Sequence, residues 1–206
     1  MALLEALAKL QGKDAAPTIA QYLTDSQLSV RKKAAELHAR LTGQHLPIIS
    51  TLSDVLPDWT FFQRFSKNPI AIIETSKGRI TVELFIQEAP FTVQNFVKLA
   101  EQHFFDGLTF HRVVSNFVIQ GGDPKGDGSG GPPYSIRSEF TRRRFERGII
   151  GMASAGKDTE GSQFFIMHSH HPHLDGRYTA FGLVKNGFET IDKIEIGDKI
   201  LSVRVQ

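Results

Sequence analysis

The sequence predicts a mainly β protein, a closed or nearly closed antiparallel barrel preceded by a small helical segment. Two observations lead to this fold class. After residue 69 the apolar residues fall into many short runs of strand-like composition, interrupted by only two helical patterns. Before residue 69 the pattern is helical. Many short strands with few helices are typical of a barrel, and 206 residues suffice for such a domain with a small attachment.

The helical segment is expected to comprise residues 1–43. Leucines recur at helical spacing over 3–10, and a second pattern covers 30–41, with Asp25 or Ser26 as its N-cap. The second pattern looks like the second helix of a HEAT-type repeat. A solenoid buries its core by stacking repeats, and only about one and a half are present here. We therefore expect the chain to be the C-terminal piece of a longer protein; the alternative is a helical extension packed on the main domain.

Residues 44–69 are expected to be a mixed linker, because Pro47, Pro57 and Pro69 divide this stretch. The segment WTFFQRF, residues 59–65, carries four aromatic side chains that are not expected to lie exposed as a patch. We expect these aromatic residues to fix the helical segment and the barrel together: Trp59, Phe61, Phe62 and Phe65.

Residues 70–206 are expected to form the barrel. Residues 70–85 are predicted to be a hairpin with a Ser-Lys-Gly turn, and residues 89–105 a helix. A second, short helix is expected near 187–194. Further strands are predicted at 108–114, 117–121, 148–153, 163–168, 180–184 and 199–205.

Composition and charge narrow the class of protein. A formal net charge of +2 does not favour nucleic acid or an anionic membrane as a partner. The absence of cysteine excludes disulfides, thiolate nucleophiles and cysteine-based zinc sites. No apolar run approaches the roughly 18 residues that span a bilayer, and the N-terminus has the pattern of an amphipathic helix and not of a signal peptide. Neither observation decides the compartment, so cytoplasm and periplasm both stay open.

The usual reactive motifs do not occur in the sequence. There is no GxSxG elbow, no HExxH motif, no credible Ser/His/Asp spacing, and no pair of carboxylates that stands out as an acid and a base. The glycine-rich loop 121–133 has no phosphate-binding pattern followed by a helix, so we interpret it as a rim loop. We therefore expect no cofactor, and either binding or catalysis by positioning and electrostatics.

The run MHSHHPH is the strongest metal-like signal. Imidazole is a common zinc or copper ligand, and the run contains His168, His170, His171 and His173. No carboxylate or further histidine lies at a ligand-like spacing, which favours an exposed histidine-rich loop without a metal. A metal-binding scaffold that uses these four histidines stays as an alternative.

The stretch FHRVVSNFVIQGGD, residues 110–123, sets Arg112 and Gln120 among apolar residues and ends on a Gly-Gly pair. An arginine in such a setting is expensive to bury, because an unpaired charge that leaves water costs several kcal/mol or more. Taken alone, Arg112 is most simply a surface salt-bridge residue on a barrel strand.

Two further blocks follow this stretch in order: GMASAGKDTEGSQFFI (151–166) and LDGRYTAFG (174–182). Together the three blocks resemble the cyclophilin-type peptidyl-prolyl cis-trans isomerases, and the resemblance extends over residues 70–205. It implies a closed eight-stranded antiparallel β-barrel capped by two helices. It also implies rotation of X-Pro bonds in peptides and proteins, assistance to protein folding, and no cofactor. The expected partners are proline-containing peptides and flexible protein segments, with the helical segment as a further protein-binding surface.

The resemblance implies that Arg112 is the catalytic residue. Rotation about an X-Pro bond is easier when the proline nitrogen turns pyramidal and regains its lone pair. A guanidinium aimed at that lone pair binds the twisted amide better than the planar one, without any proton transfer.

The other site residues implied by the resemblance bind the substrate. The proline ring would lie in an apolar pocket lined by Phe117, Val118, Phe165 and Leu174. The peptide main chain would be bound by Gln120, Ala153, Ser154, Ala155 and Gln163. Phe110 and Phe164 are expected in the barrel core.

Four positions depart from the usual residues of the family: Val118 replaces methionine, Ser154 asparagine, His173 tryptophan and Tyr178 histidine. The resemblance associates that tryptophan with binding of cyclosporin, so we expect weak cyclosporin sensitivity. None of the four changes removes the arginine or the aromatic pocket, and activity is expected. The alternative is a binding module that holds proline-containing chains without turnover, against which the retained Arg112 argues.

Overall fold

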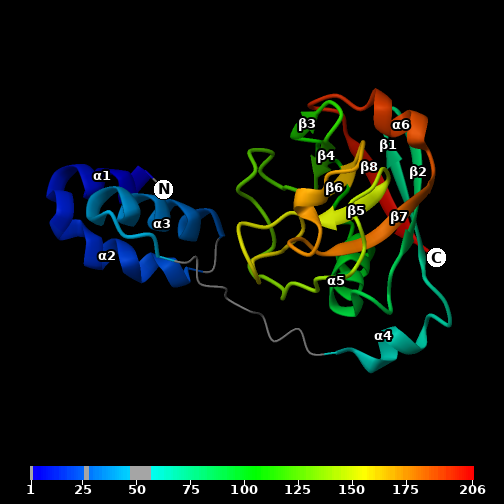
Figure 1. The fold of residues 1–206 in the computed structure, drawn as a ribbon, viewed down its shortest axis with the longest axis horizontal. Coiled ribbons are helices and arrows are strands. Elements are labelled where there is room, and N and C mark those ends of the chain that lie inside the picture. Colours follow the sequence, from blue (N-terminus) through cyan, green and yellow to red (C-terminus); the bar gives the residue numbers. More distant parts are fainter. Residues whose placement is uncertain (1, 26–27, 47–56) are drawn as a thin grey trace.

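An antiparallel β-sheet organises the C-terminal two thirds of the chain (Figure 1). The structure is a computed structural model that describes residues 2–25, 28–46 and 57–206. Within these residues the sheet has eight strands: β1 (Ile70–Thr75), β2 (Gly78–Leu84), β3 (Arg112–Val114), β4 (Val118–Gly121), β5 (Ile149–Met152), β6 (Phe164–Met167), β7 (Ala180–Asn186) and β8 (Ile200–Val205). Each predicted strand has a counterpart: β1 and β2 alternate between buried and more exposed residues, whereas β5 and β6 are short apolar runs that are buried throughout.

The prediction of a closed barrel is wrong, because the sheet is open. Its order is β3-β4-β6-β5-β7-β2-β1-β8, so β3 and β8 are the two edges. Between the edges there is one isolated bridge, Thr109↔Lys199, together with a few backbone hydrogen bonds such as Gly107 N–H to the Ile200 carbonyl at 2.7 Å. β3 has only three residues, all paired with β4, and it is too short to continue a ladder onto β8. The result is an open half-barrel.

Two helices pack on the sheet as expected: α5 (Pro90–Glu101) and α6 (Phe188–Lys193). Phe96 of α5 is buried in the main core, where its ring lies 5.1–5.7 Å from those of Phe105, Phe164 and Phe181. The helix predicted over 89–105 ends at Glu101, and the chain then turns through His103, which has a positive φ of 58°. Phe110 and Phe164 are fully buried in this core, as predicted.

The N-terminal helices form a separate body with a small core of their own. They are α1 (Ala2–Gln11), α2 (Ala16–Gln21) and α3 (Leu28–Thr42), with short 3-10 turns η1 (Gly12–Ala15) and η2 (Tyr22–Thr24) between them. Leu4, Ile19 and Leu37 lie in that core, while Leu3 and Leu10 are exposed. Ser26, one of the two predicted caps, lies outside the described residues.

The predicted linker contains a fourth helix, α4 (Trp59–Gln63), which Figure 1 shows beneath the sheet domain. Asp58 caps α4 by accepting from Phe61 N–H at 3.1 Å, and its side chain pairs with Lys98 of α5 at 2.8 Å. Phe61 is buried in the main core, whereas Trp59 is 70% exposed. The aromatic segment therefore docks on the barrel, and the described contacts do not join it to the N-terminal helices. Residues 47–56 of the predicted linker lie outside the described residues.

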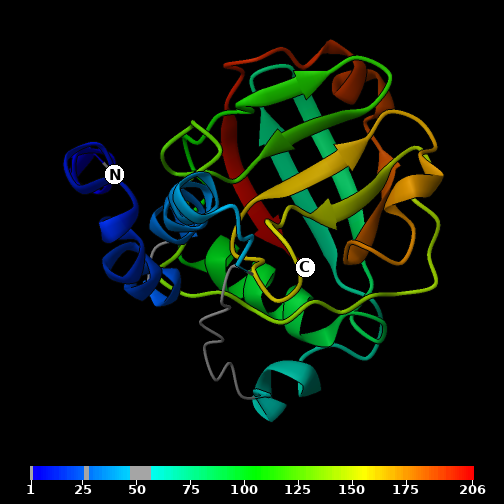
Figure 2. The same cartoon turned by 60° about the vertical axis from the view of Figure 1, so that its left-hand side comes forward.

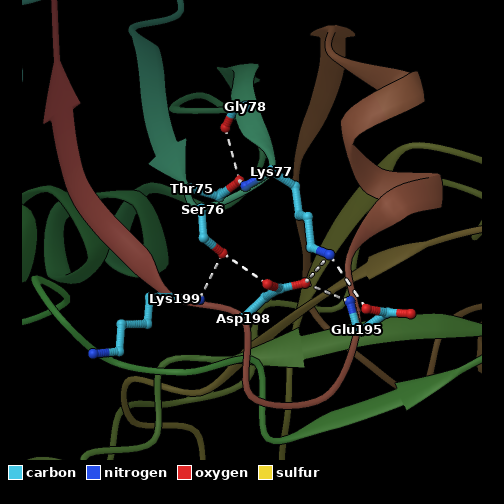
Figure 3. Close-up of polar contacts among 7 residues, drawn as sticks. All are labelled: Thr75, Ser76, Lys77, Gly78, Glu195, Asp198 and Lys199. Carbon is cyan, nitrogen blue, oxygen red and sulfur yellow. Dashed lines mark hydrogen bonds and ion pairs between the residues drawn. The ribbon is translucent and has the colours of Figure 1, made fainter.

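A polar cluster ties the β1–β2 turn to the loop before β8 (Figure 3). Ser76 Oγ donates to Asp198 at 2.8 Å and accepts from Lys199 N–H at 3.1 Å, and Lys77 Nζ bonds Glu195 at 3.2 Å. Thr75 Oγ1 closes the turn on the Gly78 carbonyl at 2.7 Å. These bonds join the first hairpin of the sheet to its last strand.

Candidate functional site

Arg112 lies at the start of the edge strand β3, and its side chain is exposed. Its register partner on β4 is Gln120, and Arg112 Nη1 donates to Gln120 Oε1 at 3.2 Å. The guanidinium carbon lies 5.5 Å from the centre of the Phe117 ring. Because the charge stays in contact with solvent, the burial penalty that makes this residue conspicuous in the sequence does not arise.

A chain of side-chain amides fixes the orientation of Gln120. Its Nε2 donates to Gln163 Oε1 at 3.0 Å, and Gln163 Nε2 donates to the Gly130 carbonyl at 2.8 Å. The Gln120 carbonyl oxygen is thereby turned toward Arg112. The guanidinium is thus positioned by a network that extends across β4 and β6 to the glycine-rich loop.

An apolar hollow lies beside this network. Val118, Phe165 and Leu174 are buried in a small second cluster, with Phe117 half-buried against it. The Phe165 ring stacks on Phe145 with centroids 5.6 Å apart. Tyr178 lies edge-on to Phe165 at 5.8 Å. The floor of the hollow is therefore a set of packed rings that can accept a small apolar group.

This hollow has a volume of about 640 Å³, and we call it the proline cavity after the substrate group that the sequence resemblance implies there. It is lined by Arg112, Phe117, Val118, Gln120, Ala153, Ser154, Ala155, Gly156, Lys157, Phe165, His173, Leu174, Arg177 and Tyr178. The structure thus brings together every predicted site residue except Gln163, which lies one step away behind Gln120. Sequence reasoning missed Lys157 and Arg177, because single charged residues in loops carry no periodic or spacing signal.

One side of the proline cavity is the segment that follows β5. Ala153 N–H donates to the Gln163 carbonyl at 2.9 Å, and Ala155 N–H donates to Thr159 Oγ1 at 2.9 Å. These bonds hold residues 153–155 in place as an edge of the cavity, with Ala155 at a bend of the chain. Such an edge can pair with a peptide main chain in the manner of an added strand.

Two titratable groups close to the site are shielded from water: the Glu160 side chain is buried, and the ring nitrogens of the half-buried His111 are covered. His111, next to Arg112, has a pKa lowered mainly by burial, and neither ring nitrogen has a hydrogen-bond partner among the described residues. Glu160, behind residues 153–159, has a pKa raised chiefly by burial, with the neighbouring charge of Asp158 acting in the same direction. The sequence pattern does not flag either residue as shielded from water.

The four histidines of the run 168–173 do not converge on one point, although His171 and His173 both lie beside Phe117. His168 Nε2 lies 3.3 Å from the Ile191 carbonyl, and His170 lies 3.9 Å from Asp175. The rings of His171 and His173 lie 4.7 Å and 6.0 Å from that of Phe117. Among the residues that the structure describes, no group of three or more histidines and carboxylates could hold a metal ion, which does not favour the metal-scaffold alternative. No helix in the same part of the chain combines the length and apolar character that crossing a membrane requires.

Known proteins resemble this chain over the sheet domain. Residues 70–205 match the family described as cyclophilin type peptidyl-prolyl cis-trans isomerase/CLD. A peptidyl-prolyl cis-trans isomerase of Synechococcus elongatus is 48% identical over 137 residues, which are 66% of this chain and 94% of that protein. Peptidyl-prolyl cis-trans isomerase B of Bacillus subtilis is 51% identical over 131 residues, 63% of this chain and 92% of the relative.

A solved structure agrees with these sequence matches. It is a cyclophilin-type peptidyl-prolyl cis-trans isomerase of Cryptosporidium parvum, crystallised in the presence of the dipeptide Ala-Pro. It superposes with a TM-score of 0.63 at 33% sequence identity, over 66% of this chain and 98% of the other.

Proposed function

This chain belongs to the cyclophilin-type peptidyl-prolyl cis-trans isomerases and is an isomerase of that kind, and we propose that it rotates X-Pro bonds by placing the Arg112 guanidinium on the twisted prolyl amide. The observation that carries the proposal is the position of Arg112, which is exposed beside the apolar part of the cavity and oriented by Gln120.

The barrier to rotation about the X-Pro bond defines how much transition-state stabilisation Arg112 has to supply. An X-Pro bond isomerises slowly because rotation breaks amide resonance, at a cost of about 18–20 kcal/mol. In the twisted amide the nitrogen is pyramidal and its lone pair accepts a hydrogen bond, which the planar amide does not offer. A preorganised cationic donor therefore binds the transition state selectively, with an effect of about 3 kcal/mol or roughly a hundredfold in rate.

The surroundings of Arg112 suit this role. The structure describes one side-chain hydrogen bond for Arg112, to Gln120, while a guanidinium has five N–H donors. Donors thus remain for a substrate amide. The proline ring would occupy the hollow formed by Phe117, Val118, Phe165 and Leu174, with His173 and Tyr178 at its rim. The peptide main chain would lie along residues 153–155, with Gln120 and Gln163 as side-chain partners.

The direct test is the cis-to-trans relaxation of a short peptide with one Ala-Pro bond, followed by NMR exchange. The protein should accelerate the relaxation, and Arg112→Ala should remove most of the acceleration. Arg177→Ala is the matched control, since it deletes an arginine from the wall of the same cavity and should leave the rate within about twofold. Peptide binding without any acceleration by the intact protein would make it a proline-recognition module instead.

A role in protein folding extends the same activity to protein segments. Uncatalysed prolyl isomerisation takes tens of seconds and limits the folding of chains with native cis-prolines. We expect the intact protein to shorten the slow refolding phase of such a chain, and Arg112→Ala to leave that phase slow. If the intact protein and Arg112→Ala shorten the slow phase equally, the effect on folding does not depend on Arg112.

The helical segment is proposed to be a HEAT-like region that presents protein partners to the barrel. Its exposed Leu3 and Leu10 on α1 are the side chains that further helices or a partner would cover. The proposed division is 1–43 for this region, 44–69 for the connection and 70–206 for the isomerase domain. Residues 57–206 alone should keep the activity on the short peptide, because α4 packs on α5 and the main core.

A further inference from the structure

We propose that α3 completes the substrate groove and that Lys32 makes the isomerase prefer peptides with an acidic side chain close to the proline. This inference rests on the proposed function, since it concerns the substrate class of the same site. It adds a specificity residue from the helical segment, outside the part of the chain that matches the isomerase family.

The position of α3 against the barrel is fixed by Arg31, a fully buried arginine. Its Nη2 donates to Ser135 Oγ at 2.8 Å, and its Nη1 donates to the Asp25 carbonyl at 2.6 Å. Ser135 follows the glycine-rich loop, so this contact joins helices and barrel at the rim of the groove. Figure 2 shows α3 lying beside these loops of the barrel.

Lys32, the next residue, faces a second hollow, the loop cavity of about 320 Å³. Its other walls come from the barrel, chiefly residues 128–135 and 159–163. The loop cavity shares Gln120, Ala153 and Ser154 with the proline cavity. A peptide with its proline beside Arg112 can therefore place a neighbouring side chain near Lys32. Because the two cavities share lining residues and an extended chain advances about 3.3–3.6 Å per residue, we expect that side chain within about three residues of the proline.

The ammonium group of Lys32 has no ion-pair partner among the described residues. Asp123 and Asp127 lie near enough to favour its charge, but Asp123 already accepts hydrogen bonds from three backbone N–H groups of its own loop. The contrast is Lys33, whose Nζ lies 3.0 Å from both Glu5 and Glu36. Burial lowers the pKa of Lys32, which agrees with a cation that lacks a close counter-charge.

The same sign of charge continues along the whole groove. A third hollow of about 800 Å³, the helix cavity, lies between α3 and Ala155 and shares Ala155 with the proline cavity and Lys32 with the loop cavity. The cations that line the three hollows are Arg112, Lys157, Arg177, Lys32, Lys125 and Arg40. Among the described residues that line them, the only carboxylate is that of Glu36, which pairs with Lys33. For a chain of net charge +2, this concentration of positive charge favours an acidic ligand.

The test compares peptides that differ by one charge. Each carries a single Ala-Pro bond and has either Glu or its neutral isostere Gln at one of the three positions on either side. We expect the Glu peptide to have a kcat/KM about fivefold higher at the position that meets Lys32, and this preference to shrink as salt is added. The parent peptide without Glu reports the isomerase activity itself.

Variants assign the preference to Lys32. Lys32→Gln should abolish the preference for Glu, and Lys32→Glu should replace it by a preference for Lys at the same position. Lys33→Gln removes the same charge from the adjacent residue and should keep the preference for Glu. Lys33→Gln should also act on the parent peptide at the rate of the intact protein. If Lys32→Glu does not melt cooperatively, Lys32→Gln carries the comparison.

Two results would overturn the inference: no preference for Glu at any position, or a preference that survives Lys32→Gln. Either result together with rapid turnover of the parent peptide leaves the proposed function intact. If the parent peptide is not turned over, the proposed function fails. The dissociation constants of the Glu and Gln peptides then show whether Lys32 still favours an acidic side chain. Equal dissociation constants for the two peptides would exclude this role of Lys32.

Discussion

Two arginines of this protein occupy opposite environments. Arg112 on β3 is exposed at the edge of the proline cavity, whereas Arg31 on α3 is fully buried between the helices and the barrel. Arg112 has one described side-chain hydrogen bond, to another side chain, while Arg31 is held by a serine and a backbone carbonyl. The exposed arginine keeps donors for a substrate. The buried one fixes how the helical segment sits on the barrel, because a charge shielded from water depends on hydrogen bonds to the surrounding protein groups.

This contrast predicts that substitution of Arg112 lowers the catalytic activity, whereas substitution of Arg31 weakens the docking of α3. Arg112→Ala should lower kcat/KM on a neutral Ala-Pro peptide about a hundredfold, because the donor to the twisted amide is lost. The midpoint of thermal unfolding should stay unchanged, since the side chain is exposed. A variant that loses activity and stability together would show that Arg112 is a structural residue.

Arg31→Ala should weaken the docking of α3 by about 2 kcal/mol, because it leaves buried acceptors unpaired and removes a large buried side chain. Hydrogen exchange in residues 128–135 should become faster, while activity on the neutral peptide should persist. Arg31→Met, which keeps most of the volume without the charge, should cost less.

Arg40→Ala is the control for this experiment, as it removes an exposed arginine from the same helix. Its exchange pattern should match that of the intact protein. Unchanged exchange in Arg31→Ala would mean that the contact with Ser135 does not hold the two bodies together.

His173 tests the rim of the cavity on the side of Arg112. The resemblance places a cyclosporin-binding tryptophan at this position, and here the imidazole lies 6.0 Å from the Phe117 ring. We expect weak cyclosporin binding by the intact protein and about tenfold tighter binding by His173→Trp, from the larger apolar ring. Calorimetric titration measures both, and a tight complex with the intact protein would contradict the expectation.

Glu160 is a third ionisable side chain to compare with the two arginines: a buried carboxyl group of which only one oxygen has a described hydrogen bond. Thr179 Oγ1 donates to its Oε1 at 3.3 Å, while Oε2 has no partner among the described residues. Burial raises its pKa, so the unfolded chain releases this proton at a lower pH than the folded protein does. Between those two pKa values the folded state holds more protons, and its stability therefore falls as pH rises above the ordinary glutamate range.

Glu160→Gln should remove that decline, with an effect of about 1 kcal/mol at neutral pH, the size expected for one buried polar group. Chemical denaturation over a pH series measures it. The same slope with and without the substitution would assign the pH dependence to another group.

The sequence predicted the parts of the molecule that depend on local patterns. Strand and helix positions follow from side-chain periodicity and from short apolar runs, and the residues around Arg112 follow from three sequence blocks that resemble one family. The openness of the sheet was missed because closure depends on pairing between edges far apart in the chain. α4 was missed because a five-residue helix leaves almost no periodic signal.

Arg31 and Lys32 were missed for a related reason. Within the run Arg-Lys-Lys on an amphipathic helix, each cation has the pattern of a solvent-facing residue. The partner of Arg31, Ser135, lies 104 positions further along the chain. Such a contact depends on how the N-terminal helices dock on the sheet domain, which no local sequence pattern predicts.

The pairing of β1 with β8 has a consequence for how the chain is made. Ala71 lies opposite Val205, and the cluster around Ser76 and Asp198 strengthens the same junction. During synthesis the N-terminal helices can form early, because their contacts are local, whereas the outer edge of β1 stays unpaired until residues 200–205 have left the ribosome. This unpaired edge is exposed to other chains during that interval. A truncation that removes β8 is therefore expected to leave an aggregation-prone nascent chain.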